Sequence, residues 1–295
     1  MNKNLLFVFN PHSGKSQIKN KLMEIIQLFS RSGYQIEIHA TGQAKEAEKI
    51  VQERGKDKQL IVCAGGDGTL HETLCGIMQL DTRPILGYIP TGTTNDFACS
   101  LGLSKNLVTA AKNIILGKTV SYDIGLFDQS YFAYIAAFGL FTDIPYLTPQ
   151  ELKRILGYQA YLIEAVKRLS NIQPIHILLR YDKKEIEGDF IYGMITNATQ
   201  IAGMKNIMGR NVKMDDGIFE GLLLHMPNNP LELGDILAAL FSTGHKASNH
   251  IHKFRSKKIE VFSDSPIPWV LDGEFGGNKQ NVQIQSLQRA IRIQY

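Results

Sequence analysis

Short aliphatic runs alternate with helical periodicity over the first part of the chain. Continuous apolar runs are typical of strands buried on both faces of a sheet, whereas helices that cover a sheet repeat apolar residues every three or four positions. The pattern predicts strands at residues 5–9, 34–39, 60–62 and 85–89 and helices at residues 18–29, 44–54, 70–78 and 108–116. Regular alternation of strand and helix implies a mostly parallel sheet covered on both faces, in an α/β domain spanning residues 1–122.

The pattern changes after Tyr122, because most of the later segments are typical of strands joined by short turns. Strands are predicted at residues 131–141, 175–181, 185–197, 219–225, 258–262, 269–271 and 282–295, and helices only at residues 149–169 and 231–241. Consecutive strands with short connections favour an antiparallel sheet or sandwich. The sequence therefore predicts a second, β-rich domain over residues 123–295.

Composition limits the classes of function. The chain has 295 residues and a net charge of +4, which would favour an anionic surface such as phospholipid headgroups but is too mild for a nucleic-acid binder. Its three cysteines, Cys63, Cys75 and Cys99, lack metal-ligand spacing and sit in apolar surroundings. Such free cysteines fit a reducing cytosol. No signal peptide and no apolar run of about 18 residues is present. We expect a cytoplasmic protein whose membrane contact is peripheral.

One glycine-rich loop stands where a predicted strand leads into a predicted helix. Its sequence is Gly65-Gly66-Asp67-Gly68-Thr69. Glycines let a ligand approach the backbone, and the first turn of a helix offers unpaired N–H groups that suit phosphate. A plain strand-to-helix turn is the alternative, but one glycine would suffice for it. The acidic Asp67 inside a phosphate-type loop points to a metal ion.

Two further polar loops follow predicted strands of the same domain. They are Asn10-Pro11-His12-Ser13-Gly14-Lys15 and Pro90-Thr91-Gly92-Thr93-Thr94-Asn95-Asp96-Phe97. The first lacks the spacing of a P-loop and could be a surface turn; in the second, Thr94 or Asn95 can cap the helix that follows. Parallel strands end at one edge of a sheet, where ligands of α/β proteins bind, so we expect the three loops to meet.

A fourth motif, Leu271-Asp272-Gly273-Glu274, places two carboxylates around a glycine in the second domain. A carboxylate held beside a bound phosphate donor can act as general base toward a substrate hydroxyl. By itself the motif is more often a plain turn, so its meaning depends on the other three loops.

The four motifs together resemble the diacylglycerol kinase catalytic-domain family, most closely the soluble bacterial lipid kinases. They occur in the order of that family and cover almost the whole chain. The Gly-Gly-Asp-Gly-Thr element is shared with NAD kinases and, more distantly, 6-phosphofructokinases, whereas the Pro90–Phe97 loop and Asp272-Gly273-Glu274 favour the lipid branch. The resemblance implies a Rossmann-like N-terminal domain of the NAD kinase and diacylglycerol kinase type, followed by an antiparallel β-sandwich.

The resemblance also implies roles for individual residues. ATP would contact Asn10, Pro11, His12, Ser13, Gly14, Lys15, Thr41, Gly65, Gly66, Asp67, Gly68, Thr69, Glu72, Thr93, Asn95 and Asp96. Asp67 would support the catalytic Mg²⁺ and the phosphates, Glu274 would be the general base, and Asp272 would be a metal ligand or an orienting group.

A second, structural Mg²⁺ site is implied for the segment 213–218. There Asp216 would supply a carboxylate, and the backbone carbonyls of Lys213 and Ile218 would complete the shell. The residues alone favour a plain Asp-Asp-Gly turn between strands.

The expected reaction is transfer of the γ-phosphate of ATP to a lipid hydroxyl at the membrane surface, with diacylglycerol as the best guess and phosphatidic acid as its product. The alternatives are a related kinase acting on phosphatidylglycerol, a sphingoid base or NAD, and a nucleotide-binding regulatory protein without catalysis. Homodimerisation stays open. Only 21 residues follow Glu274. So short a tail predicts that the chain end does not return to the first domain.

Overall fold

Four strands of the N-terminal lobe form the parallel part of the sheet, as the sequence predicts. They are β1 (Lys3–Phe9), β2 (Tyr34–Ala40), β3 (Leu60–Gly65) and β4 (Ile85–Pro90). They lie in the order β4-β3-β1-β2 with every pairing parallel. All six residues of β3 are buried, because it lies between β1 and β4 with helices on both faces.

The computed structural model describes residues 3–14, 17–140, 173–201, 204–205, 207–209, 211–241 and 248–295. The helix predicted at residues 149–169 and the nucleotide contact predicted for Lys15 lie outside this part of the chain.

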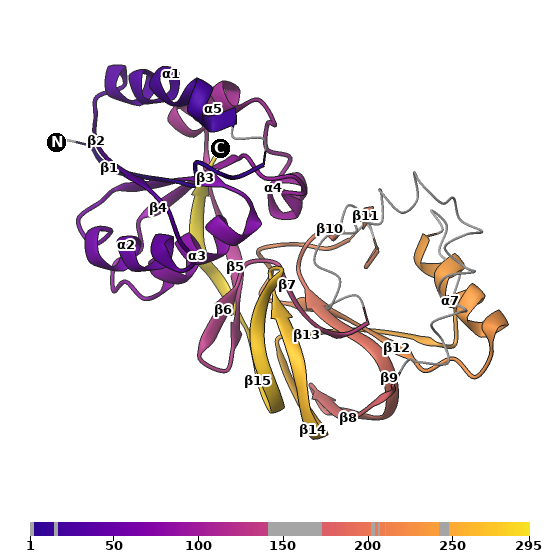
Figure 1. Cartoon of the computed structure of the whole chain (residues 1–295). Helices are drawn as coiled ribbons and strands as arrows, with labels where there is room; N and C mark the ends of the chain where they lie inside the picture. Colours follow the sequence, from indigo (N-terminus) through magenta and orange to yellow (C-terminus); the bar gives the residue numbers. More distant parts are fainter. Residues whose placement is uncertain are drawn as a thin grey trace.

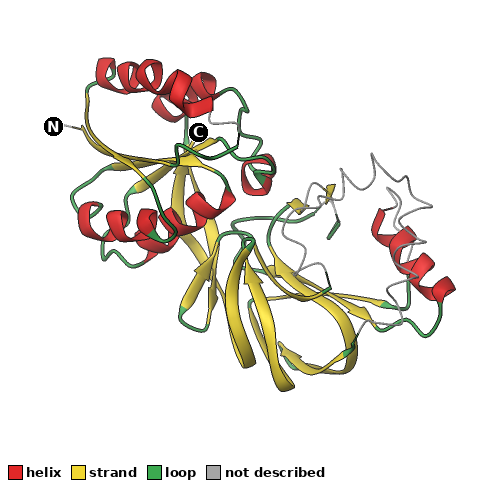
Figure 2. Ribbon diagram, viewed as in Figure 1, coloured by secondary structure: helices red, strands yellow, loops and turns green. Residues whose placement is uncertain are grey.

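Two pairs of helices cover the parallel sheet, one pair on each face (Figure 2). The four are α1 (Gln17–Arg31), α2 (Glu46–Arg54), α3 (Asp67–Met78) and α5 (Leu107–Leu116). Alternate side chains of β1 serve the two faces, since Phe7 belongs to the core beneath α1 and α5 while Leu6 and Val8 belong to the core beneath α2 and α3.

The second lobe is built from antiparallel strands. These are β5 (Thr119–Phe127), β6 (Ser130–Phe132), β7 (Ile135–Gly139), β8 (Ile175–Tyr181), β9 (Lys184–Thr196), β12 (Phe219–His225), β13 (Ile251–Ser256), β14 (Lys258–Leu271) and β15 (Glu274–Gln294). A small hairpin of β10 (Gln200–Ile201) and β11 (Met204–Lys205) and the helix α7 (Pro230–Phe241) complete it.

A single sheet continues through both lobes, so the antiparallel strands do not form a separate two-sheet sandwich. Both β7 and β8 pair with β9 and with β14, so these four strands close into a ring. The ring surrounds an aromatic core in which Trp269 contacts Phe127 and Phe138 at centroid distances of 5.1 and 4.8 Å.

The last strand corrects the expectation for the chain end. β15 leaves the antiparallel lobe and joins β4 in parallel, with Ile293 opposite Leu86, so the C-terminus lies in the first lobe (Figure 1). The prediction of a non-returning tail is wrong, because β15 is 21 residues long and spans both lobes. The domain boundary predicted at residue 122 falls inside β5, which pairs with β15.

Two further predictions about strands need correction. The strand predicted at residues 131–141 is split into β6 and β7, because the backbone between them turns its N–H groups toward Asp272. The strands predicted at residues 258–262 and 269–271 are one strand, β14, in which a shift of register between Phe262 and Ile267 accommodates Pro266, whereas Pro268 stays in register opposite Asn278.

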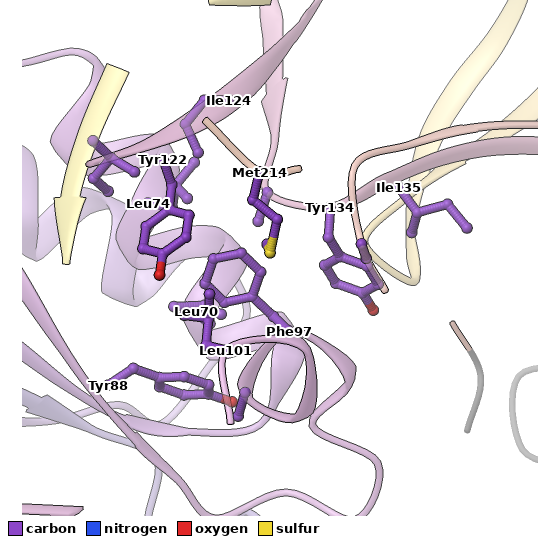
Figure 3. Close-up of a cluster of buried hydrophobic side chains, with 14 of the residues drawn as sticks. Leu70, Leu74, Tyr88, Phe97, Leu101, Tyr122, Ile124, Tyr134, Ile135 and Met214 are labelled. Atoms are coloured by element: carbon purple, nitrogen blue, oxygen red, sulfur yellow. The ribbon is translucent and has the colours of Figure 1, made fainter. Parts of the chain in front are cut away.

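Apolar side chains also join the two lobes. Phe97 in the short helix α4 (Asp96–Ser100) and Leu101 after it belong to the same buried cluster as Tyr134 and Met214 of the second lobe (Figure 3). The rings of Phe97 and Tyr134 lie 6.3 Å apart. The loop that ends in α4 is therefore held from both sides.

Candidate active site

The three polar loops predicted to meet at the carboxyl edge of the parallel strands lie against one another. Gly66 and Gly92 approach so closely that a Cβ on Gly92 would lie 2.7 Å from the Cα of Gly66. Main-chain bonds hold the loops in register, since Asn10 N–H donates to Ala64 O at 2.9 Å and Thr91 N–H donates to Gly65 O at 2.8 Å. The glycines of these loops thus allow backbone to pack on backbone.

The first loop is shaped by its own side chain. Asn10 Oδ1 accepts a hydrogen bond from His12 N–H at 2.8 Å, across Pro11, and Asn10 O accepts one from Ser13 N–H at 3.2 Å. Such Asx turns fix a tight loop without secondary structure. Ser13 is buried against Gly66, whereas His12 and Gly14 are exposed.

Gly14→Ala is expected to destabilise the protein and weaken nucleotide binding. Gly14 has φ +55°, and a Cβ there would collide with the carbonyl oxygen of Thr91. Gly102→Ala is the matched control, because Gly102 has φ +68° with open space around its Cβ position. Both variants carry the left-handed strain of about 1–2 kcal/mol, and the clash adds about 1–3 kcal/mol only at Gly14. Urea unfolding and ATP titration of both variants measure the difference; equal losses would contradict the loop packing.

The N-terminus of α3 faces the meeting point of the loops. Gly66 is its N-cap and provides no side-chain cap, and Leu70 N–H makes the first helical bond, to Gly66 O at 3.0 Å. The N–H groups of Asp67, Gly68 and Thr69 form the positive end of the helix dipole. This geometry suits a phosphate group.

Asp67 is the first residue of α3 and is mostly buried. Its Oδ1 has no hydrogen-bond partner. Burial, reinforced by the charges of Asp96 and Asp272, raises the pKa of the Asp67 carboxyl to about 7. A buried carboxylate oxygen without a partner is a donor atom that Mg²⁺ prefers, so this residue fits the predicted catalytic metal.

The side chains of Asn95 and Asp96, both predicted to contact the nucleotide, make hydrogen bonds within the protein. The Asn95 amide closes its own loop, because its Oδ1 accepts from Gly92 N–H at 3.0 Å and its Nδ2 donates to Gly92 O at 2.7 Å. Asp96 is buried, and its Oδ1 accepts a 3.3 Å hydrogen bond from the Gln200 amide of the second lobe. Both residues therefore shape the site through bonds within the protein. Thr93, which follows Gly92 in the same loop, is exposed.

Glu72 and Thr41 are also engaged by the protein itself. The Glu72 carboxylate accepts hydrogen bonds from Lys45 N–H at 2.8 Å and Ala47 N–H at 3.1 Å, so it caps the first turn of α2. The buried Thr41 hydroxyl donates to Phe9 O at 3.4 Å. The nucleotide contacts predicted for these two residues gain no support from this geometry.

Glu274 reaches the helix end from the opposite lobe. Asp272 and Gly273 form a two-residue turn between β14 and β15, both with positive φ, as hairpins of this length require. Glu274 follows the turn, and its Oε1 lies 2.6 Å from the position that a Cβ of Gly68 would take. A glycine at residue 68 therefore makes room for an exposed carboxylate beside the first turn of α3.

Asp272 is fully engaged within the protein. Its carboxylate accepts hydrogen bonds from the backbone N–H groups of Ala133, Tyr134 and Ile135 at 2.6, 2.9 and 3.1 Å. A fourth contact, 2.8 Å long, comes from His71 Nδ1 on α3. Of the two roles expected for Asp272, this geometry favours orientation over metal binding.

In the segment predicted to hold a second Mg²⁺, the Asp216 carboxylate already has partners within the protein. Asp216 Oδ1 accepts from Ile218 N–H at 3.1 Å, and its Oδ2 pairs with Arg255 Nη2 at 3.0 Å. The described residues contain no group of three or more His, Cys, Asp or Glu side chains that could hold a metal. Both carboxylate oxygens of Asp216 are therefore engaged within the protein, and the Mg²⁺ site at residues 213–218 stays a prediction.

Two residues of this region escaped the sequence reasoning. His71 is four positions after Asp67 on α3, a spacing that places both on one helix face and could have flagged it. Asp123 is completely buried and accepts bonds from Gly217 N–H at 2.6 Å and Arg289 N–H at 2.7 Å. No local pattern signals Asp123, because its partners lie far along the chain.

Known proteins of the same architecture share this arrangement of lobes. The family model described as diacylglycerol kinase catalytic domain matches residues 4–127. A diacylglycerol kinase of Bacillus subtilis (strain 168) is 32% identical over 277 residues, which are 93% of this chain and 91% of that protein. The chain belongs to the diacylglycerol kinase family. A diacylglycerol kinase of Staphylococcus aureus (strain MRSA252) is likewise 32% identical over 297 residues, covering 99% of this chain and 92% of its own.

A crystal structure of a diacylglycerol kinase from Bacillus anthracis str. Sterne has the same fold, with a TM-score of 0.79 at 23% identity and coverage of 99% of this chain and 97% of that one. Membership of the diacylglycerol kinase family makes the protein a lipid kinase, and hence a transferase. Across the described residues, no helix is long and apolar enough to cross a membrane.

Proposed function

We propose that this lipid kinase transfers the γ-phosphoryl group of ATP to the hydroxyl of a membrane lipid, diacylglycerol first among the candidates, and so forms phosphatidic acid. The observation that carries the proposal is the position of Glu274. A carboxylate from the second lobe lies beside Gly68, at the helix end and loops that suit phosphates. Donor and acceptor groups would meet there.

The donor half is proposed to be the Rossmann-like unit of residues 1–122. The end of β15 adds to its sheet by pairing with β4. The loops after β1, β3 and β4 would receive the phosphates, because their glycines bring backbone N–H groups close to a ligand. Asp67 would hold Mg²⁺, which supplies neutralisation of phosphate charge when bound. Phosphoryl transfer depends mainly on such positioning and charge compensation.

The acceptor half is proposed to be the β-rich unit of residues 123–295. Glu274 would accept the proton of the lipid hydroxyl as its oxygen attacks the γ-phosphorus. The bond between that phosphorus and the oxygen of ADP breaks, so that the products are ADP and a lipid phosphomonoester. The exposure of Glu274 leaves its carboxylate open to a substrate hydroxyl.

Peripheral membrane contact follows from the substrate, because a diacylglycerol molecule stays in the bilayer while its hydroxyl is phosphorylated. The net charge of +4 supports attraction to anionic headgroups. Homodimerisation and the second Mg²⁺ at residues 213–218 remain predictions.

The decisive experiment incubates purified protein with Mg²⁺, γ-labelled ATP and a panel of acceptors in mixed micelles. The panel contains diacylglycerol, phosphatidylglycerol, sphingosine and NAD. We expect label in phosphatidic acid. Label in another member of the panel would reassign the acceptor, and label in none would favour the alternative of a nucleotide-binding regulatory protein.

Phe275→Ser is expected to raise the KM for the lipid acceptor about tenfold or more, because burying a phenylalanine is worth about 1.5–3 kcal/mol. Phe275 follows Glu274 directly in β15 and is 70% exposed, an apolar side chain on the same hairpin as the proposed base. Leu116→Ser is the matched control, since Leu116 is 84% exposed on α5 of the other lobe. Surface-dilution kinetics measure both variants. An unchanged lipid KM in Phe275→Ser would remove Phe275 from the acceptor surface.

A further inference from the structure

A contact between His71 and Asp272 joins the two halves of the site. His71 lies on α3, one helical turn after Asp67, and its Nδ1 is 2.8 Å from Asp272 Oδ2, although 201 positions separate the two in sequence. The exposed fractions of the two side chains are 16% and 1%. The hydrogen bond is thus shielded from water, and it connects the phosphate-facing helix to the turn that carries Glu274.

Among the described residues, the other hydrogen bonds of Asp272 stay within its own lobe. Three backbone N–H groups, of Ala133, Tyr134 and Ile135 at the start of β7, donate to its carboxylate, and Asp272 N–H donates to Ile135 O at 2.9 Å. These bonds fix the hairpin to the second lobe. The hydrogen bond from His71 joins this hairpin to α3 and keeps Glu274 beside Gly68.

His71 is charged at neutral pH. Burial opposes the charge, but the hydrogen bonds and charge interactions with Asp272 and Cys75 together outweigh it, and the pKa of His71 rises to about 11. Cys75 Sγ lies 3.7 Å from the other ring nitrogen and donates weakly to Tyr131 O, next to the residues that hold Asp272. The imidazolium is therefore enclosed by partners from both lobes.

We propose that His71 is a positioning residue: its hydrogen bond to Asp272 holds Glu274 over Gly68 at the N-terminus of α3. The kinetic part of this inference rests on the proposed function. Without the donor at residue 71, the hairpin would keep its bonds to the second lobe but lose its fixed distance to the phosphates. A base displaced by about 1 Å can lower a rate about 10²-fold without changing substrate binding.

The test compares His71→Asn with His71→Leu, because the two side chains have nearly the same size and only asparagine can donate to Asp272. We expect the leucine variant to lose about 10–100-fold in kcat, with the KM for ATP within about twofold of wild type. The asparagine variant should recover most of the loss. His176→Leu is the control, since His176 pairs with Asp189 at 2.9 Å and Glu187 at 3.4 Å on the surface of β8 and β9.

A second measurement does not depend on turnover. Hydrogen exchange should quicken at the backbone amides of residues 272–275 in the leucine variant and stay near wild type in the asparagine variant. If the wild type phosphorylates no acceptor, the proposed function fails, while hydrogen exchange still decides the role of His71. His71→Ala replaces the leucine variant if that one does not fold. Wild-type kcat and exchange in a variant without a donor, even one with a lowered Tm, would overturn the proposal.

Discussion

Glu274→Gln is expected to lower kcat for lipid phosphorylation by about 10²–10⁴-fold, the range that general-base catalysis contributes. Glutamine keeps the size of the side chain and its place beside Gly68, but it cannot accept the proton of an attacking hydroxyl. ATP affinity should stay within about twofold of wild type, because the donor loops lie in the other lobe. Steady-state kinetics and ATP titration together separate these two effects.

Glu187→Gln provides the control for this prediction. Glu187 is 67% exposed on β9, so its change removes one carboxylate from the same lobe without touching the site. Substantial turnover in Glu274→Gln would remove Glu274 as the base. A large loss of ATP affinity would instead place its carboxylate among the groups that hold the donor. In either case the division of the site between two lobes would have to be redrawn.

The donor side of the site follows from local rules. Aliphatic strands buried on both faces identify the order of elements, and parallel strands deliver their polar loops to one edge. The loops that carry Gly66 and Gly92 are therefore predicted to meet, and the two glycines lie in backbone contact. Family resemblance added the acceptor motif, whose position no periodicity could supply.

The fine roles of polar residues could not be derived in the same way. The family resemblance implies a nucleotide contact for Glu72, whereas its carboxylate caps α2, a helix that approaches only in three dimensions. Asn95 is the N-cap residue of α4, as predicted, but its amide closes the loop around Gly92 and makes no cap hydrogen bond. Each carboxylate or amide takes the backbone donors that tertiary packing brings nearest, and sequence spacing does not encode that choice.

The path of the last strand is a similar case. The short tail predicted a chain end that does not return to the first domain, yet β15 pairs with β14, β5 and β4 in turn and carries the chain end into the first lobe. Its length was hidden because the segment between Phe275 and Val282 is polar and lacks a core-facing pattern. Hydrogen bonding to β14 holds that segment in the sheet, an effect that hydrophobic periodicity does not report.

Asp67→Asn is expected to abolish most of the kinase activity and, at the same time, to stabilise the free protein above pH 7. The catalytic loss follows from the proposed metal site, because an amide oxygen binds Mg²⁺ far more weakly than a carboxylate. The gain in stability follows from burial. Folding takes this carboxyl from water into a site that also feels Asp96 and Asp272, so its pKa rises from 3.8 to about 7.

The sign of the pH dependence can be worked out from that shift. Between about pH 4 and pH 7 the folded protein keeps a proton on Asp67 that the unfolded chain has released, so the free energy of unfolding falls as pH rises. Above pH 7 the loss is complete, on the order of 4 kcal/mol for a pKa that rises from 3.8 to about 7. Other buried acids, such as Asp123 and Glu220, make the same contribution to the pH dependence of stability in wild type and in Asp67→Asn. The difference between wild type and variant isolates Asp67.

Urea unfolding at pH 5 and pH 8 measures this difference, with Asp57→Asn, an exposed residue after α2, as the control. We expect Asp67→Asn to lose less stability than wild type between the two pH values, and Mg²⁺ with ATP to stabilise wild type more than the variant. If the free energy of unfolding changed equally with pH in wild type and variant, burial would not raise the pKa of the Asp67 carboxyl. A buried functional carboxylate is expected to behave in this way. Its charge destabilises the fold of the free protein, and a bound ligand would give it a partner.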